Sequence, residues 1–273
     1  MIDTMANDFA SHPEVMSLRV CILGSGSKGN CTYIESPEAH ILIDAGLSAR
    51  EIERRLRQID RSPATLDGVL ISHEHSDHIQ GVGALARRYK LPVYANPATW
   101  QKAQHVVGMV DDWREFSTGN QFVLKDLVVE PFSLPHDADD PVAFRLTWRR
   151  RLMAVVTDLG YSSQLVRERL RGCHLLVLEA NHDDTMLKAG PYPWPLKQRI
   201  GGKSGHLSNL QSSQVLRDVL HDELEHVVLA HLSEINNHPD LARQTVQEIL
   251  GSRGTQLGVA SQWEVSTWFL LPD

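Results

Sequence analysis

The sequence predicts a mixed α/β (α+β) fold of four layers, an αββα sandwich in which two β-sheets pack face to face and helices cover both outer sides. Short apolar runs typical of strands alternate with segments of helical periodicity, and this alternation occurs in both halves of the chain. With 273 residues, the chain is long enough for one large two-sheet domain. We expect this domain to span residues 18–273, after a flexible leader at residues 1–17.

Strands are expected in the first half where an apolar run ends in a turn or a polar segment. They cover residues 18–23, 31–34, 39–43, 68–72 and 92–94. Ser48 is a candidate N-cap for a helix over residues 48–58, since Ile52 and Leu56 follow at helical spacing. Two further helices are expected, one over residues 79–89 and one after Asn96-Pro97.

The second half shows the same alternation. Strands are expected at residues 121–130, 143–148, 152–157, 175–178 and 227–230, and helices at residues 163–171, 209–220 and 239–250. The C-terminal WEVSTWFLLPD indicates a closing strand, with Trp263 and Trp268 in the core. Loops at the strand ends of such a sandwich converge along one edge, where functional sites usually lie.

The composition favours a cytoplasmic protein that is not inserted in a membrane. Apolar runs are far too short for a membrane span, and the first residues lack the pattern of a signal peptide. Three cysteines without a CxxC pair fit a reducing compartment. A net charge of −7 argues against a chain that is cationic throughout, so binding to nucleic acid would need local basic patches or metal ions.

Histidine and aspartate crowd the segment LISHEHSDHI, at the end of an apolar run. In an extended segment His73 and His75 face the same side, so both can bind one metal ion. Asp77 and His78 follow a bend and can reach a second ion. The alternative is a solvated polar turn. Four ligand-type residues at a strand end instead favour a site for zinc, iron or manganese.

A site for two metal ions needs more ligands, and three candidates each follow an apolar run. They are His136 after VVEPFSLP, Asp158 at the end of RLMAVVTD and His231 at the end of HVVLAH. A single residue of this kind is usually only a polar strand end. Together with HEHSDH, the three predict a dinuclear site.

This constellation resembles the metallo-β-lactamase superfamily, from about Leu18 onward. The resemblance implies one set of ligands for each of two divalent cations (zinc, manganese or iron) and one bridging carboxylate. By this resemblance, His73, His75 and His136 bind one cation. Asp77, His78 and His231 bind the other, and Asp158 bridges the two. It also implies a hydroxide between the cations as the nucleophile, with Asp77 among the catalytic residues.

Two further segments resemble ribonuclease Z-like phosphodiesterases. GHLSN places His206 just before a helix, and LLVLEANHD ends a buried strand at Glu179. By that resemblance, His206 protonates the leaving oxygen, while Glu179 orients His206 and raises its pKa. Taken alone, His206 could belong to a helix-capping loop and Glu179 could be a structural acid.

Six segments together are similar to the YycJ/WalJ type of this superfamily. They are GSGSKGNCTYIE, LIDAGLS, HEHSDHIQGVGALARRY, TDLGY, LEANHDDTMLKAGPYPWPLKQRIGGKSGHLSN and LAHLSEINN. The insert NHDDTMLKAGPYPWPLKQRI is the most specific feature. This similarity implies a metal-dependent 5′-to-3′ DNA exonuclease that acts on DNA ends, with a proposed part in DNA mismatch repair.

Polar and basic residues close to these motifs are candidates for substrate binding. They are Ser27, Asn30, Asn181, His182, Lys197, Arg199 and Lys203. The first two lie in a Gly/Ser-rich turn that could cradle an anion, and the last three precede His206 and could meet phosphates. The basic turn at residues 149–151 would extend this path. Tyr192 and Trp194 could stack on a terminal base.

Two other functions use the same ligands. A small-molecule hydrolase, such as a cyclic phosphodiesterase or a thioesterase, would act at the same dinuclear site. A metal-loaded scaffold that binds DNA without hydrolysing it is the third alternative, although such scaffolds usually lose metal ligands.

Overall fold

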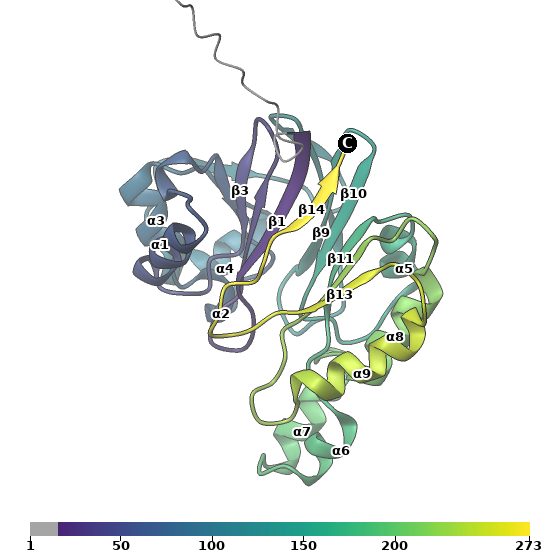
Figure 1. Cartoon of the computed structure of the whole chain (residues 1–273). Helices are drawn as coiled ribbons and strands as arrows, with labels where there is room; N and C mark the ends of the chain where they lie inside the picture. Colours follow the sequence, from purple (N-terminus) through teal and green to yellow (C-terminus); the bar gives the residue numbers. More distant parts are fainter. Residues whose placement is uncertain (1–15) are drawn as a thin grey trace, which may run out of the picture.

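Two seven-stranded sheets face each other at the centre of the molecule (Figure 1). The computed structural model describes residues 16–273. The first sheet has the order β14 (Phe269–Pro272), β1 (Ser17–Gly24), β2 (Cys31–Glu35), β3 (His40–Ile43), β4 (Gly68–Leu70), β5 (Val93–Ala95), β6 (Trp113–Glu115). The second has the order β13 (Gln256–Val259), β12 (His226–Ala230), β11 (Leu175–Glu179), β10 (Arg151–Val156), β9 (Val142–Trp148), β8 (Leu127–Ser133), β7 (Phe122–Leu124).

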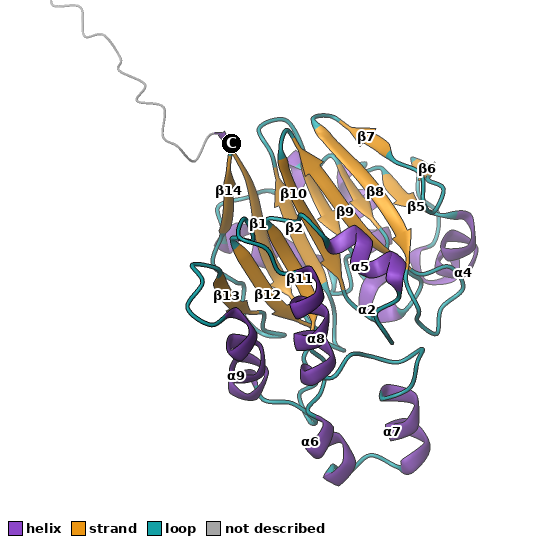
Figure 2. Ribbon diagram, turned by 90° about the vertical axis from the view of Figure 1, so that its right-hand side faces the viewer, coloured by secondary structure: helices purple, strands orange, loops and turns teal. Residues whose placement is uncertain are grey.

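Helices cover the outer face of each sheet, which confirms the four-layer sandwich (Figure 1). The elements beside the first sheet are α1 (Ala49–Gln58), η2 (Pro63–Thr65), α2 (Ser76–Ile79), α3 (Val82–Tyr89) and α4 (Pro97–Val107). Those beside the second are α5 (Gln164–Leu170), α8 (Asn209–Val219) and α9 (Pro239–Leu250). Figure 2 shows α6 (Asp184–Ala189) and α7 (Trp194–Ile200) projecting beyond this body. No helix within residues 16–273 has the length and hydrophobicity needed to cross a bilayer.

The strands that lead to the site are apolar on both faces because each sheet is covered on both sides. In β3, Ile41 and Ile43 pack in the core between the sheets. Leu42 points the other way and packs with Ile52 and Leu56 of α1. The loops that follow these strands therefore start from fixed positions.

The structure corrects several expected elements. The strand predicted over residues 121–130 is a hairpin, β7–β8, which turns at Lys125 in the left-handed region (φ 54°). The helix predicted over residues 79–89 begins at Ser76 and breaks near Gly81. A side chain at Gly81 would lie 2.3 Å from the carbonyl oxygen of Leu47, so this position requires glycine. Strand β6 and helices α6 and α7 were not expected. Of the predicted leader, residues 1–15 lie outside the described part of the chain.

Candidate metal centre

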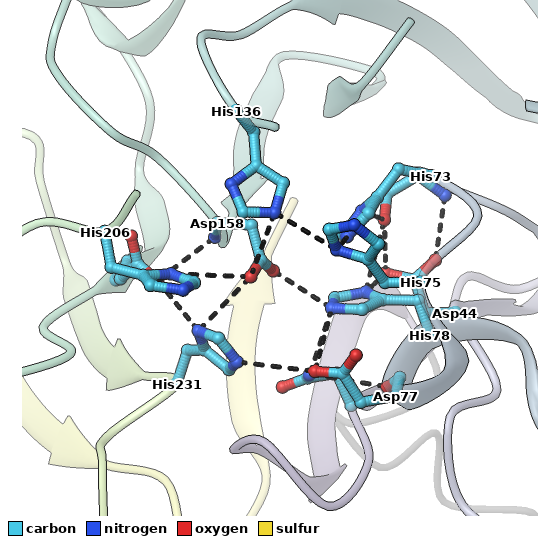
Figure 3. A network of polar contacts seen from close by, with 12 residues as sticks. Asp44, His73, His75, Asp77, His78, His136, Asp158, His206 and His231 are labelled. Carbon is cyan, nitrogen blue, oxygen red and sulfur yellow. Dashed lines mark hydrogen bonds and ion pairs between the residues drawn. The ribbon is translucent and has the colours of Figure 1, made fainter. Parts of the chain in front are cut away.

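All seven predicted metal ligands meet at one edge of the sandwich, at the ends of strands from both sheets (Figure 3). His73 and His75 follow β4, while Asp77 and His78 lie in α2. The remaining three follow strands of the second sheet: His136 after β8, Asp158 after β10 and His231 after β12. The two sheets thus bring together residues that are up to 158 positions apart, His73 and His231.

One group of donors consists of His73, His75 and His136. The Nδ1 atom of His75 lies 3.1 Å from Nε2 of His73 and 3.3 Å from Nε2 of His136. Nitrogen ligands about 2.0–2.1 Å from a tetrahedral zinc ion lie roughly 3.3 Å from one another. The three imidazoles are therefore spaced as ligands of one cation.

A second group consists of Asp77, His78 and His231, next to the first. Oδ2 of Asp77 lies 3.7 Å from Nε2 of both histidines. Asp158 stands between the groups, with Oδ2 3.0 Å from Nε2 of His78 and Oδ1 3.8 Å from Nε2 of His136. Its carboxylate is thus placed to serve both groups, as the bridging role requires.

The protonation and burial of these donors fit a divalent cation. Nε2 of His231 is buried and forms no hydrogen bond, which is costly unless a cation binds there. Burial lowers the pKa of His73 well below its usual value, so this imidazole is neutral, the form that binds metals. Burial alone would also lower the pKa of His231, but Asp158, Asp77 and Glu179 outweigh it and raise this pKa to about 10. The carboxylates therefore favour positive charge at this position.

Asp44 and Ser72 support the second group from behind, and the sequence analysis did not identify them. Oδ2 of Asp44 accepts a hydrogen bond from Nδ1 of His78 at 2.7 Å, which turns Nε2 toward the other donors. The hydroxyl and backbone amide of Ser72 also donate to Asp44. Asp44, Asp158 and His231 have φ values of 58°, 60° and 57°, in the left-handed region. Strained backbone of this kind is frequent at functional sites. In the sequence, Asp44 can be recognised as the acidic residue that follows the apolar strand in LIDAG.

We expect Asp44→Ala to weaken metal binding about 10–100-fold, because His78 loses the acceptor that fixes its orientation. Metal titration of the purified protein measures this change. Asp60→Ala is the matched control, since Asp60 is an exposed aspartate with a similar φ of 56°. Equal metal affinity for the Asp44 variant and the unaltered protein would contradict the proposed support.

Gly46 lets the loop before α1 approach the ligand segment closely. A Cβ atom at Gly46 would lie 1.6 Å from the carbonyl oxygen of Asp77. We expect Gly46→Ala to lower the free energy of unfolding by about 1–3 kcal/mol and to displace Asp77, because backbone must move to relieve the overlap. Denaturant unfolding and metal titration measure both effects. Gly254→Ala is the control, since a Cβ atom there meets no other atom within 4 Å. A Gly46 variant as stable as this control would rule out the close approach.

Glu179 lies beneath the site and fixes two histidines. Its Oε1 accepts hydrogen bonds from Nδ1 of His206 at 2.9 Å and from Nδ1 of His231 at 2.8 Å. Backbone amides of Asp158, Leu159 and Leu207 donate to the same carboxylate. Burial would raise the pKa of Glu179, but these partners, His206 first, lower it to about 2. Glu179 is therefore ionised, and Nε2 of each histidine is left free to face the site.

His206 is the histidine at this site outside the two donor groups. Burial alone would lower its pKa, but the Glu179 carboxylate outweighs this effect and the pKa is raised. Its side chain lines a cavity of about 270 Å³, together with His75, Asp77 and His136. His206 is thus placed as a proton donor at the edge of the donor groups.

The other predicted substrate residues differ in position. Ser27, Asn181 and Arg199 line the cavity. Asn30 is buried with Nδ2 3.1 Å from Nε2 of His78, and His182 is 1% exposed, so neither faces the cavity.

Several aromatic and basic side chains lie outside the cavity. Lys197 and Lys203 do not line the cavity, and Lys197 donates to the carbonyl of Lys188. Tyr192 lines the cavity, but Trp194 is 66% exposed beside it. Trp263 is 60% exposed, so its expected place in the core is wrong.

Comparison with known proteins agrees with this geometry. The family model described as "Beta-lactamase superfamily domain" matches residues 39–232. The chain therefore belongs to the β-lactamase superfamily, and its fold and site are those of a metal-dependent hydrolase.

Within the superfamily, the chain belongs to the YycJ/WalJ type. It is 40% identical over 247 residues to exodeoxyribonuclease YycJ of Bacillus anthracis, covering 90% of this chain and 94% of that protein. It is 38% identical over 248 residues to exodeoxyribonuclease WalJ of Streptococcus pneumoniae, covering 89% and 92%. The metallo-β-lactamase fold protein YhfI of Bacillus subtilis shares the fold at 17% identity, with a TM-score of 0.72 over 92% of this chain and 99% of that chain.

Proposed function

We propose that this protein is a phosphodiesterase that degrades DNA from an end in the 5′-to-3′ direction, with two divalent cations (zinc, manganese or iron) in the centre described above. The observation that carries the proposal is the position of His206, held by Glu179 beside two adjacent groups of metal donors. The names of the YycJ and WalJ relatives support the choice of DNA. We place the reaction in the cytoplasm, which suits three buried, unpaired cysteines.

Different residues of the site contribute to different parts of the hydrolysis. When bound, two cations activate water as a nucleophile and clamp a phosphate oxygen. His73, His75 and His136 would hold one cation, and the second group the other, with Asp158 shared. Asp77 is 21% exposed at its side chain and lines the cavity, so it can accept a hydrogen bond from the attacking water.

His206 completes the reaction by giving the proton on Nε2 to the leaving oxygen as the phosphorus–oxygen bond breaks. Glu179 keeps that proton available, because its carboxylate binds Nδ1–H and stabilises the charged imidazole. Asn181 and Ser27 line the same cavity and would bind phosphate oxygens of the substrate.

Digestion of single- and double-stranded DNA and RNA, labelled at the 5′ or the 3′ end, tests this proposal with manganese, zinc and iron in turn. We expect early release of the 5′ label from DNA and no reaction after removal of metal. Intact DNA with every metal would refute the function, and release from the 3′ end alone would refute the direction.

We expect combined charge reversal at Lys197 and Lys203 to reduce DNA cleavage at least about tenfold, because each lost phosphate contact weakens binding. Arg199 is left unaltered, because its ion pair with Asp137 fastens α7 to the loop that carries His136. Hydrolysis of bis(p-nitrophenyl) phosphate should barely change. Arg150→Glu is the control: it lies in the turn before β10, while Asp158 follows that strand, roughly 20 Å away along the chain. Residues 149–151 thus lie at the opposite end of β10 from Asp158.

A small-molecule hydrolase is the second candidate, and the modest cavity volume of about 270 Å³ favours it. It would hydrolyse bis(p-nitrophenyl) phosphate or a thioester without shortening DNA, and charge reversal would leave its activity unchanged.

A further inference from the structure

Helices α6 and α7 form an arm over residues 184–203 that stands out from the two-sheet body (Figure 2). The arm carries four basic side chains and one acidic one, in a chain whose net charge is −7. No residue of α7 is buried. The arm is therefore a locally cationic, lightly packed structure at the mouth of the cavity.

One wall of the cavity comes from this arm and is apolar. Tyr192, Leu196 and Ile200 line it, and Leu196 and Ile200 lie four residues apart on one side of α7. None of the three belongs to the hydrophobic cores formed by the described residues. This half-buried apolar strip lies beside a cluster of metal donors and outside the hydrophobic cores of residues 16–273, so it suits a flat, apolar part of a substrate.

This apolar wall is tied directly to the proton donor. The backbone amide of His206 donates to the carbonyl of Ile200 at 2.8 Å. Nε of Arg199 donates to Oδ2 of Asp137 at 2.6 Å, which fastens α7 to the loop that carries His136. A side chain at Gly205 would lie 2.2 Å from the carbonyls of Arg199 and Ile200, so the link between wall and histidine is compact.

From this arrangement we infer that the apolar wall binds the nucleobase of the nucleotide that leaves, with Tyr192 as its stacking surface. The inference rests on the proposed function, because it takes His206 as the donor to the leaving oxygen. The nucleotide that bears this oxygen must then lie beside His206, and the wall is the adjacent apolar surface. The basic side chains of the arm would bind the phosphates of the substrate.

Binding of the base to Tyr192 favours some DNA ends over others. A base that stacks on Tyr192 has left the stack of its own duplex, which costs least at an unpaired end. We expect faster cleavage of single-stranded or frayed ends than of fully paired ends.

A cycle of paired changes in protein and substrate tests the contact. One oligonucleotide carries thymidine at the end that is attacked, and the other carries an abasic tetrahydrofuran there. The unaltered holoenzyme should prefer the first by about tenfold in kcat/KM. Tyr192→Ala should lose most of that preference, because the two changes remove the same contact. Trp113→Ala, in an exposed aromatic residue of β6 that does not line the cavity, should keep it.

Binding gives a second readout that does not depend on turnover. A terminal 2-aminopurine followed by a phosphorothioate linkage should lose fluorescence on binding to the holoenzyme, and this quenching should disappear in Tyr192→Ala. An equal base preference in both proteins would overturn the inference while leaving the exonuclease proposal intact. Absence of DNA cleavage by the unaltered protein would overturn both.

Discussion

Replacing Asp158 with alanine is expected to abolish hydrolysis of every phosphodiester, with a loss of at least about a thousandfold. Its carboxylate stands between the two donor groups, 3.0 Å from His78 and 3.8 Å from His136. The side chain is buried, so water cannot substitute freely for the lost oxygens. Without it, each donor group would keep three residues and would lack the carboxylate that is placed to serve both.

Metal analysis separates this loss from unfolding. Asp158→Ala should bind less metal than the unaltered protein, and Asp158→Asn, which retains the volume but not the charge, should show a similar defect. Asp139→Ala is the control, because this exposed aspartate pairs with Lys102 outside the donor groups. An Asp158→Ala protein with full metal content and normal turnover would refute the bridging role.

The strands and the clustering of the candidate metal ligands could be predicted from sequence because both depend on local patterns. Apolar runs marked the strands of both sheets, and polar residues at their ends marked His136, Asp158 and His231. Burial of the strands on both faces makes this signal strong, since a polar residue stands out where an apolar run ends.

The parts that sequence did not reveal depend on contacts between distant segments. Asp44 supports His78 only because β3 and β4 are neighbours in the first sheet. Trp263 was assigned to the core on its aromatic character, yet it is exposed and Lys28 lies over its ring at 4.5 Å. The arm lacks helical periodicity around its three prolines, so α6 and α7 could not be expected.

His206→Ala is expected to slow DNA cleavage by about a thousandfold, within the range typical of general acid catalysis. The sugar oxygen that leaves phosphorus is strongly basic and needs a proton as the phosphorus–oxygen bond breaks. Nε2 of His206 is the donor that Glu179 holds in place, with Nδ1–H bound to the carboxylate at 2.9 Å. No other histidine outside the two donor groups lines the cavity among the described residues.

Substrates with different leaving groups distinguish a general acid at position 206 from a residue with a structural role. p-Nitrophenolate leaves without a proton, so His206→Ala should reduce hydrolysis of bis(p-nitrophenyl) phosphate far less than cleavage of DNA. Metal content should stay unchanged, and His105→Ala, an exposed histidine of α4, should behave as the unaltered protein. Equal losses on both substrates would mean that His206 acts on the metal centre or the fold, because only proton transfer depends on the basicity of the departing oxygen.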